Sequence, residues 1–428
     1  MKIQTSSASR YRWTVCALLF FATTINYVDR QVIGLLKPTL EVEFMWAESD
    51  YAAIVMVFSL AYALGYLVFG RIVDSIGTKI GYVVSVFFWS LAAMLHGVVT
   101  TAFGFGAVRA FLGISEAGNF PTAIKATAEW FPKKERALAT GIFNSGTSLG
   151  PVIAPLLVPL ILGAFGWKHA FFWTGALGFV WLVFWIWLYE IPSKQKRLST
   201  AEFNYIQDGD EMEPKAPNIS WKKLFCYRQT WTFILGKLMT DPIWWFFLFW
   251  LPSYFSSVYN IDFKKPNLQL VVVYTATTIG SIGGGYLSSY LIRKGWITYK
   301  ARKFVMLIFA CCVIPISLAQ FSGNVWVAVF LISLAAAAHQ AWSANIFTTV
   351  SDMFPRYAVS TVVGIGGMAG SVGGILFPYM VGQMLDYYKA AGDIALGYNI
   401  LFMLSGSVYV LAWLVMHLLS PRMEKVNL

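Results

Sequence analysis

Residues 26–30, Asn-Tyr-Val-Asp-Arg, place an acid and a base side by side inside a long apolar segment, residues 13–36. A charged side chain at the centre of a membrane span costs roughly 2.5–3.5 kcal/mol on insertion scales. Such side chains normally face the interior of a helix bundle, where a partner of opposite charge or water offsets this cost. We therefore expect Asp29 and Arg30 to face the interior of a bundle of membrane-spanning helices.

The composition excludes an ordinary soluble protein. Of the 428 residues, 57% are apolar and only 12% are charged, and the mean hydropathy is +0.61. Apolar runs of about 20 residues, the length that crosses a bilayer, recur along the chain. The polar and basic N-terminus has no small-residue cleavage site, so we expect no signal peptide. The four cysteines have no metal-binding or redox spacing, and we expect neither a metal nor a cofactor.

The apolar runs predict an all-α membrane protein with twelve transmembrane helices in two pseudo-symmetric groups of six. We place an N-terminal bundle at 1–191, a polar cytoplasmic connector at 192–227 and a C-terminal bundle at 228–428. The predicted spans are 13–36, 51–72, 79–99, 101–124, 136–163, 169–191, 228–259, 267–292, 301–320, 325–350, 357–386 and 395–419.

The positions of Lys and Arg predict the orientation, because basic residues accumulate in cytoplasmic loops. With both termini cytoplasmic, three of the 32 basic residues lie within spans and the outer loops hold only Lys37, Lys168, Lys264, Lys265 and Lys389. This asymmetry also accounts for the net charge of +11 without nucleic-acid binding, since basic inner loops lie against anionic lipid. We expect a multi-pass protein of the bacterial inner membrane that works as a monomer.

An internal repeat supports the two bundles. Phe131-Pro132 precedes the fifth span and Phe354-Pro355 precedes the eleventh, an offset of 223 residues. The same offset superimposes Gly141 on Gly364 and Glu116 on His339. Repeats of this kind are typical of transporters whose binding site lies between the two halves, near the middle of the membrane.

Further charges lie on the fourth predicted span. Arg109 and Glu116 are seven residues apart, which places them on one helix face. We expect pairing across helices, of Arg30 with Glu116 or a ligand and of Asp29 with Arg109. A purely structural network of buried ion pairs is the alternative, although such networks often add little net stability.

The loop after the second span carries a motif that runs through Gly70, Asp74, Gly77 and Lys79. With this motif, the chain as a whole resembles the major facilitator superfamily. In that family the loop latches the cytoplasmic side through charge contacts at helix ends. The corresponding segment of the second half, 285–295, has Ser289 where the acid would fall, so we expect an asymmetric latch.

Within the superfamily, the chain resembles the anion:cation symporters, which include bacterial hexuronate and galactonate transporters. The resemblance is carried by 27–30 in the first span and by 109–117, 119–121 and 129–136 at the fourth span and its exit. It implies that Asp29 and Glu116 carry the coupling protons, with Arg30 and Arg109 as their charge partners. It also favours Tyr27 and Tyr62 as substrate contacts, although core or interfacial tyrosines are common.

Other polar side chains are weaker candidates for binding the substrate. Asn144 and Thr147 belong to a polar patch on the fifth span, and His339, Gln340 and Asn345 make the tenth span unusually polar. Lys237 and Asp241, four residues apart on the seventh span, form either a self-neutralised pair or an accessory anion contact. A single buried histidine is more often a satisfied hydrogen-bonding group than a functional one.

These features together predict a secondary active transporter that imports a sugar-acid anion, most closely a hexuronate, with protons by alternating access. The proposed coupling is reciprocal: protonation of Glu116 or Asp29 frees an arginine for the substrate carboxylate. An aldonate such as galactonate, another small organic anion, and sodium as the coupling ion remain alternatives. A membrane-embedded enzyme is disfavoured, because neither a metal cluster nor a nucleophile–base set is evident. A channel is disfavoured, because it would not need two pseudo-equivalent halves.

Overall fold

The computed structural model describes residues 10–46, 48–207, 221–259 and 268–428, and every regular element in these residues is a helix. The helices are α1 (Tyr11–Phe44), α2 (Glu48–Ile76), α3 (Thr78–Leu95), α4 (Ala102–Glu116), α5 (Asn119–Trp130), α6 (Lys133–Asn144), α7 (Gly146–Phe165), α8 (Trp167–Leu188), η1 (Pro192–Lys194), α9 (Thr200–Gln207), α10 (Trp221–Phe225), α11 (Arg228–Tyr259), α12 (Leu268–Arg293), α13 (Thr298–Val313), η2 (Ile314–Phe321), α14 (Val325–Met353), α15 (Val359–Ala390) and α16 (Ile394–Leu419). The predicted all-α fold is confirmed.

Each predicted span corresponds to one helix or to two consecutive helices. The fourth span is α4 followed by α5, the fifth is α6 followed by α7, and the ninth is α13 continued by the 3₁₀ helix η2. Helix α7 contains three prolines, Pro151, Pro155 and Pro159, each of which lacks the N–H that an unbroken helix needs. Such interruptions are tolerated in membranes where neighbouring helices satisfy the freed carbonyl groups.

Nine helices or helix pairs of the described chain are long and apolar enough to cross a membrane. The three predicted spans outside this set are α1, α4 with α5, and α11, which carry the acid–base pairs Asp29 and Arg30, Arg109 and Glu116, and Lys237 and Asp241. Helices α4 and α5 are each shorter than 18 residues, and all three spans carry charged side chains among their apolar residues. These charges require the protein interior rather than lipid around them.

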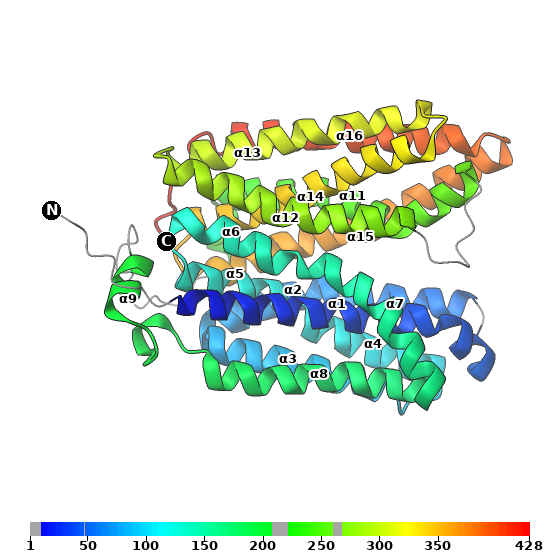
Figure 1. Ribbon diagram of the computed structural model, residues 1–428, viewed down its shortest axis with the longest axis horizontal. Coiled ribbons are helices and arrows are strands. Elements are labelled where there is room, and N and C mark those ends of the chain that lie inside the picture. Colours follow the sequence, from blue (N-terminus) through cyan, green and yellow to red (C-terminus); the bar gives the residue numbers. More distant parts are fainter. Residues whose placement is uncertain (1–9, 47, 208–220, 260–267) are drawn as a thin grey trace.

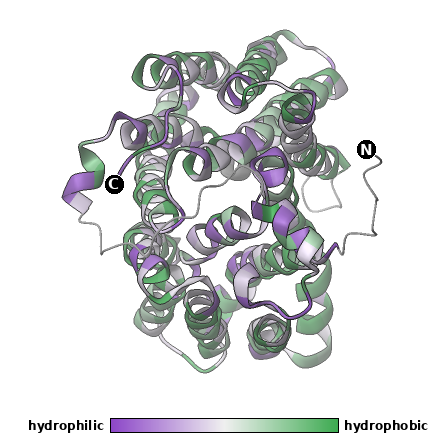
Figure 2. Ribbon diagram, turned by 90° about the vertical axis from the view of Figure 1, so that its left-hand side faces the viewer, coloured by the Kyte–Doolittle hydropathy of each residue, from purple (hydrophilic) through white to green (hydrophobic). Residues whose placement is uncertain are grey.

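The helices form two packed groups that run side by side along the long axis of the molecule (Figure 1). Helices α1–α8 form one group and α11–α16 the other, with the start of α1 and the C-terminus at the same end of the molecule, called the termini end below. Viewed from that end, hydrophobic residues dominate the peripheral helices, while hydrophilic residues lie nearer the centre and in the end segments (Figure 2). This pattern suits a bundle whose outer surface faces lipid.

The two groups contact each other through glycines that repeat between the halves. Helix α2 packs on α15 and helix α6 packs on α12. A Cβ atom added at Gly70 would collide with the carbonyl oxygen of Ser360, and one added at Gly285 would collide with the corresponding oxygen of Ala137. Gly141 and Gly364, which the repeat superimposes, similarly lie against backbone of the opposite half. Glycine at these points allows the halves to approach closely.

Part of the predicted connector packs against the N-terminal bundle. Helix α9 docks on the start of α1, where buried Glu202 accepts hydrogen bonds from the backbone N–H groups of Tyr11 and Arg12, at 3.0 and 3.2 Å. Glu202 also pairs with the Arg12 guanidinium at 2.8 Å, and this guanidinium reaches Glu135 of α6 at 2.8 Å. Residues 208–220 of the predicted connector lie outside the described residues.

Candidate functional site

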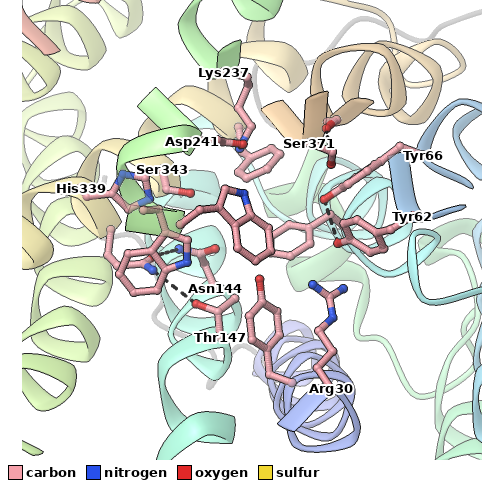
Figure 3. A pocket seen from close by; sticks show the side chains of 17 residues that line it. Arg30, Tyr62, Tyr66, Asn144, Thr147, Lys237, Asp241, His339, Ser343 and Ser371 are labelled. Carbon is pink, nitrogen blue, oxygen red and sulfur yellow. Dashed lines mark hydrogen bonds and ion pairs between the residues drawn. The ribbon is translucent and has the colours of Figure 1, made fainter. Parts of the chain in front are cut away.

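A polar cavity lies between the two halves (Figure 3). Its volume is about 50 Å³, room for only a few water molecules. A ligand as large as a sugar acid would therefore require the lining side chains to move. The lining residues are Tyr27, Arg30, Tyr62, Tyr66, Phe120, Asn144, Thr147, Lys237, Asp241, Trp244, Trp245, His339, Gln340, Ser343, Phe347, Gly367 and Ser371.

Arg30 of α1 lines this cavity with its guanidinium group. Its Nε donates to Glu116 Oε2 at 2.7 Å, and both side chains are buried. Its Nη1 and Nη2 atoms have no hydrogen-bond partner among the described residues. The guanidinium also lies over the ring of Tyr62, with 4.2 Å between Cζ and the ring centroid. The predicted pairing of Arg30 with Glu116 is thus present, and two parallel donors remain open to a ligand.

The predicted pairing of Asp29 with Arg109 is wrong for this structure. Arg109 donates from Nη2 to the main-chain carbonyl oxygen of Arg30 at 2.9 Å and lies over the ring of Phe58. Both carboxylate oxygens of Asp29 are buried without a hydrogen-bond partner in the described chain. Asp29 and Arg109 therefore lie behind Arg30, and neither side chain lines the cavity.

Tyrosines form one wall of the cavity. Tyr62 donates to the hydroxyl oxygen of Tyr66, one helical turn along α2, at 3.2 Å. Tyr27 lies under Arg30, with 4.7 Å between the guanidinium carbon and its ring centroid. The spacing of four between Tyr62 and Tyr66 places both on one helix face, which makes Tyr66 a weaker candidate from the sequence, and both line the cavity.

The opposite halves meet at the α6–α7 junction through amide side chains. Asn144 Nδ2 donates to Gln340 Oε1 at 2.8 Å and to Ser281 Oγ at 3.1 Å. Gln340 Nε2 in turn lies 3.5 Å from Thr147 Oγ1. The predicted Asn144, Thr147 and Gln340 thus form a connected polar group that links α6, α7 and α14.

His339 lines the cavity but its imidazole is already engaged. Its Nδ1 lies 2.5 Å from the hydroxyl oxygen of Tyr409, and its ring stacks on Trp244 with 5.1 Å between centroids. The next turn of α14 contributes Ser343, which sequence reasoning missed. Ser343 is four residues after His339, so helical spacing alone would have placed it on the same face.

Asn345 requires a correction, because it does not reach the cavity. Its Nδ2 donates to the carbonyl oxygens of Gly284 and Ala341, at 3.1 and 2.9 Å, and it faces α12. Asn345 is five residues from Gln340, about 140° around a helix with 3.6 residues per turn. The two amides therefore point to different neighbours.

The second half contributes its own charged pair to the cavity. Lys237 Nζ lies 2.7 Å from Asp241 Oδ2 on α11, and 4.1 Å from the ring centroid of Phe347. Aromatic residues of α11, Trp244 and Trp245, continue this wall. Among the described residues, no group of three or more His, Cys, Asp or Glu could hold a metal ion.

The motif after α2 closes the termini end between the halves. Asp74 accepts hydrogen bonds from the N–H groups of Ser360 and Thr361, at 3.3 and 2.6 Å, and pairs with Lys125 at 2.8 Å. The carboxylate thereby occupies the N-terminus of α15, where free N–H groups and the helix dipole favour an anion. Gly70 provides the close approach of α2 to α15 at the same place.

The rest of the motif shapes the turn itself. Gly77 has a φ of +87°, a conformation that favours glycine. Lys79 pairs with Glu190 at 2.9 Å within the same half. Burial of Glu190 acts to raise its pKa, but hydrogen bonds from Lys79 and from the N–H of Ile191 outweigh it and lower the pKa.

The cavity continues toward the end opposite the termini. A second cavity of about 600 Å³, lined mainly by α2 and α15, shares Tyr62, Trp245 and Ser371 with the first. Its walls include Tyr51, near the start of α2, and Tyr379, in the second half of α15. The halves are therefore joined at the termini end, and toward the other end this larger space lies between α2 and α15.

Comparison with known proteins gives consistent matches. The family model described as Major Facilitator Superfamily matches residues 19–378. The hexuronate transporter of Escherichia coli (strain K12) is 32% identical over 379 residues, with 88% of each chain covered. The galacturonate transporter of Dickeya chrysanthemi is 33% identical over 279 residues, 64% of this chain and 81% of that protein. The solved structure of the proton:xylose symporter XylE superimposes with a TM-score of 0.72 and 13% identity, covering 96% of both chains.

Proposed function

Because this chain belongs to the major facilitator superfamily of transporters, we propose that it carries a sugar-acid anion, specifically a hexuronate, in symport with protons. The observation that supports this most is the open edge of Arg30, whose Nη1 and Nη2 have no partner in the described chain. A planar guanidinium with two parallel donors matches a carboxylate bidentately. The names of the hexuronate and galacturonate relatives support the choice of sugar acid.

Proton coupling follows from the partner on the other edge of the same guanidinium. Glu116 neutralises Arg30 through Nε while no ligand is bound. When a substrate carboxylate takes over that role, a proton on Glu116 removes the surplus negative charge from a buried site. Proton and anion thereby strengthen each other's binding, and the coupling is reciprocal. Among the described residues Asp29 makes no ion pair or hydrogen bond, and burying a charged carboxylate alone costs more than protonating it, so we assign it the second proton.

The neutral polar side chains of the cavity suit the hydroxyl groups of a sugar. Asn144 and Gln340 offer both donors and acceptors from opposite halves, and Tyr27 and Tyr62 offer hydroxyl groups beside Arg30. A ligand that replaces the hydrogen bond between Asn144 and Gln340 would contact both halves at once. Such a ligand would favour one arrangement of the two halves over the other, and its binding would thereby be coupled to the change of access.

We also propose the orientation and setting of the protein. The bias of Lys and Arg favours a cytoplasmic termini end in a bacterial inner membrane. In that orientation the structure is closed toward the cytoplasm by Asp74 and α15 and leads outward through the larger cavity. The proposed direction of transport is import, by a monomer.

Uptake into proteoliposomes tests this proposal. Purified full-length protein is assayed with glucuronate, galacturonate, galactonate and xylose, under proton and sodium gradients imposed separately. We expect saturable accumulation of the hexuronates under an inward proton gradient, and none of xylose, which has no carboxylate. Accumulation driven by sodium alone would overturn proton coupling, and accumulation of none of the acids would overturn the substrate class.

A further inference from the structure

A separate cavity of about 480 Å³ lies at the termini end of the second half, where α16 ends and α11 begins. Its walls are residues 226–229 and 419–424. Two of the lining side chains, Arg228 and Arg422, are exposed cations. Within the described chain, neither guanidinium makes an ion pair or a hydrogen bond. The proposed transport mechanism uses neither residue.

The C-terminal segment that forms one wall of this cavity is fixed to the second half. The Lys303 ammonium donates to the carbonyl oxygens of Ser420 and Pro421, at 2.6 and 2.8 Å. The side-chain amide of Gln229, on α11, donates to the carbonyl oxygen of Glu424 at 3.3 Å. The two arginines are therefore presented by two segments that are bonded to each other.

Positive charge predominates around the cavity. Lys222 and Lys223, on the short helix α10 that precedes α11, are both exposed. Among the described lining residues, Glu424 is the single acid. Guanidinium groups hold phosphate oxygens through parallel N–H donors, which makes a phosphate group the anion that suits a pair of arginines.

Exposed apolar side chains lie next to the residues that line the cavity. Phe225 and Trp231 are 38% and 42% exposed, and Leu418, in the last turn of α16, is 66% exposed. The Trp231 indole N–H donates to the carbonyl oxygen of Phe225 at 2.8 Å. Tryptophan is enriched where membrane meets water, so these side chains indicate the depth of the lipid headgroups. The cavity thus combines a site for an anion with an apolar surface beside it.

We propose that this cavity binds the headgroup of an anionic phospholipid, with the phosphate between Arg228 and Arg422 and the acyl chains against Leu418 and Trp231. The proposed orientation places the cavity at the cytoplasmic leaflet, where basic pockets between membrane helices recognise acidic headgroups. A bound lipid would join the start of α11 to the C-terminal segment. The inference does not depend on which substrate the central cavity carries.

Non-denaturing mass spectrometry of the full-length protein in detergent tests this site, because it counts the lipids bound to each molecule. Phosphatidylglycerol is titrated, with phosphatidylcholine and inorganic phosphate as the comparison ligands. The variant is Arg228→Gln/Arg422→Gln, whose thermal unfolding midpoint without lipid checks that the fold is kept. The control, Lys196→Gln/Lys300→Gln, removes the same number of charges from exposed positions elsewhere.

We expect the wild-type protein to bind its first phosphatidylglycerol at least about 10-fold more tightly than phosphatidylcholine. The arginine variant should lose this preference and the lysine control should keep it. Equal affinity for the two lipids in the wild type, or an equal effect of the two double substitutions, would overturn the site. Inorganic phosphate that binds as tightly as phosphatidylglycerol would overturn the assignment to a lipid. Each of these outcomes leaves the proposed function intact, since uptake of hexuronate tests that function separately.

Discussion

At the scale of single residues, the proposed binding of a carboxylate depends on the geometry of Arg30, and Arg30→Lys tests it. Lysine keeps the positive charge toward Glu116 but has no planar pair of parallel donors for a carboxylate. We expect the KM for hexuronate to rise about 10-fold or more, the loss typical of a charge-assisted hydrogen bond. The measurement is initial uptake rate against substrate concentration, with exposed Arg10→Lys as the control. An unchanged KM would remove the carboxylate from Arg30.

Glu116→Gln separates binding from coupling. The glutamine carbonyl can still accept from Arg30 Nε, so the fold around the 2.7 Å contact should persist. Without a titrating group there, we expect accumulation driven by a proton gradient to fall to the level seen without a gradient, while exchange of labelled for unlabelled substrate continues. Counterflow and gradient-driven uptake in the same vesicles distinguish the two. Gradient-driven accumulation at the wild-type level would exclude Glu116 from the coupling.

The residues that sequence reasoning placed correctly and incorrectly differ in a physical way. Helical spacing puts Tyr62 and Tyr66, or His339 and Ser343, on shared faces, and the cavity contains all four. It equally disfavours Asn345 as a companion of Gln340. Helical spacing does not predict side-chain partners. It shows that the adjacent residues Asp29 and Arg30 must face apart, but it does not show that Arg109 donates to a backbone carbonyl oxygen instead of pairing with Asp29.

At the scale of helices, Asp74 and the N-terminus of α15 join the two halves, and Asp74→Asn should weaken this contact. The substitution removes the charge from Lys125 and from the helix dipole, interactions worth about 1–2 kcal/mol together. We expect the termini end to open about 5- to 30-fold more often. Labelling of a Ser343→Cys reporter in the cavity by a membrane-impermeant thiol reagent, applied from the termini end, measures this opening. Labelling as slow as with Asp74 intact would contradict the role.

In the other half, the position that corresponds to Asp74 is Ser289, and its contact with α6 needs no negative charge. Ser289 accepts a hydrogen bond from the N–H of Leu138 at 3.2 Å, as Asp74 does from Thr361. Leu138 is the sixth residue of α6, beyond the first turn, whereas Thr361 is the third residue of α15 and has a free N–H. We therefore expect Ser289→Asp not to rescue Asp74→Asn. Restored protection of the same reporter in the double variant would show that the two positions are equivalent.

Whole helices were largely predictable, because hydrophobic length alone defines a span. Their ends and interruptions were not. Helix α1 continues to Phe44, well beyond the predicted end at residue 36, since backbone hydrogen bonding does not stop at the membrane surface. The break between α4 and α5 lies directly after Glu116, within a stretch that hydropathy treats as continuous. Docking of α9 through Glu202 likewise depends on tertiary contacts that the polar composition of the connector conceals.

At the scale of the molecule, the structure corresponds to one of the two states that the proposed alternating access requires. Contacts of α2 with α15 and of α6 with α12 close the termini end, and the larger cavity lies toward the other. The repeat in the sequence anticipates that these contacts come in equivalent pairs, but not which end is closed. The central cavity, at about 50 Å³, is too small for the proposed sugar acid, so the proposal requires binding and a change of shape to occur together.

Gly283 and Gly285, both on α12, test whether close packing between the halves determines which end of the molecule is open. A Cβ atom at Gly285 would collide with the carbonyl oxygen of Ala137 in the opposite half, whereas a Cβ atom at Gly283 would meet nothing within 4 Å. Gly285→Ala should therefore penalise only the state closed at the termini end, and shift the population toward the other state. We expect faster labelling of Ser343→Cys from that end and at least about 10-fold slower uptake, with hexuronate binding preserved. Gly283→Ala is the matched control on the same helix, and it should leave both rates unchanged. If Gly285→Ala and Gly283→Ala behave alike, packing of α12 on α6 does not control which end is open.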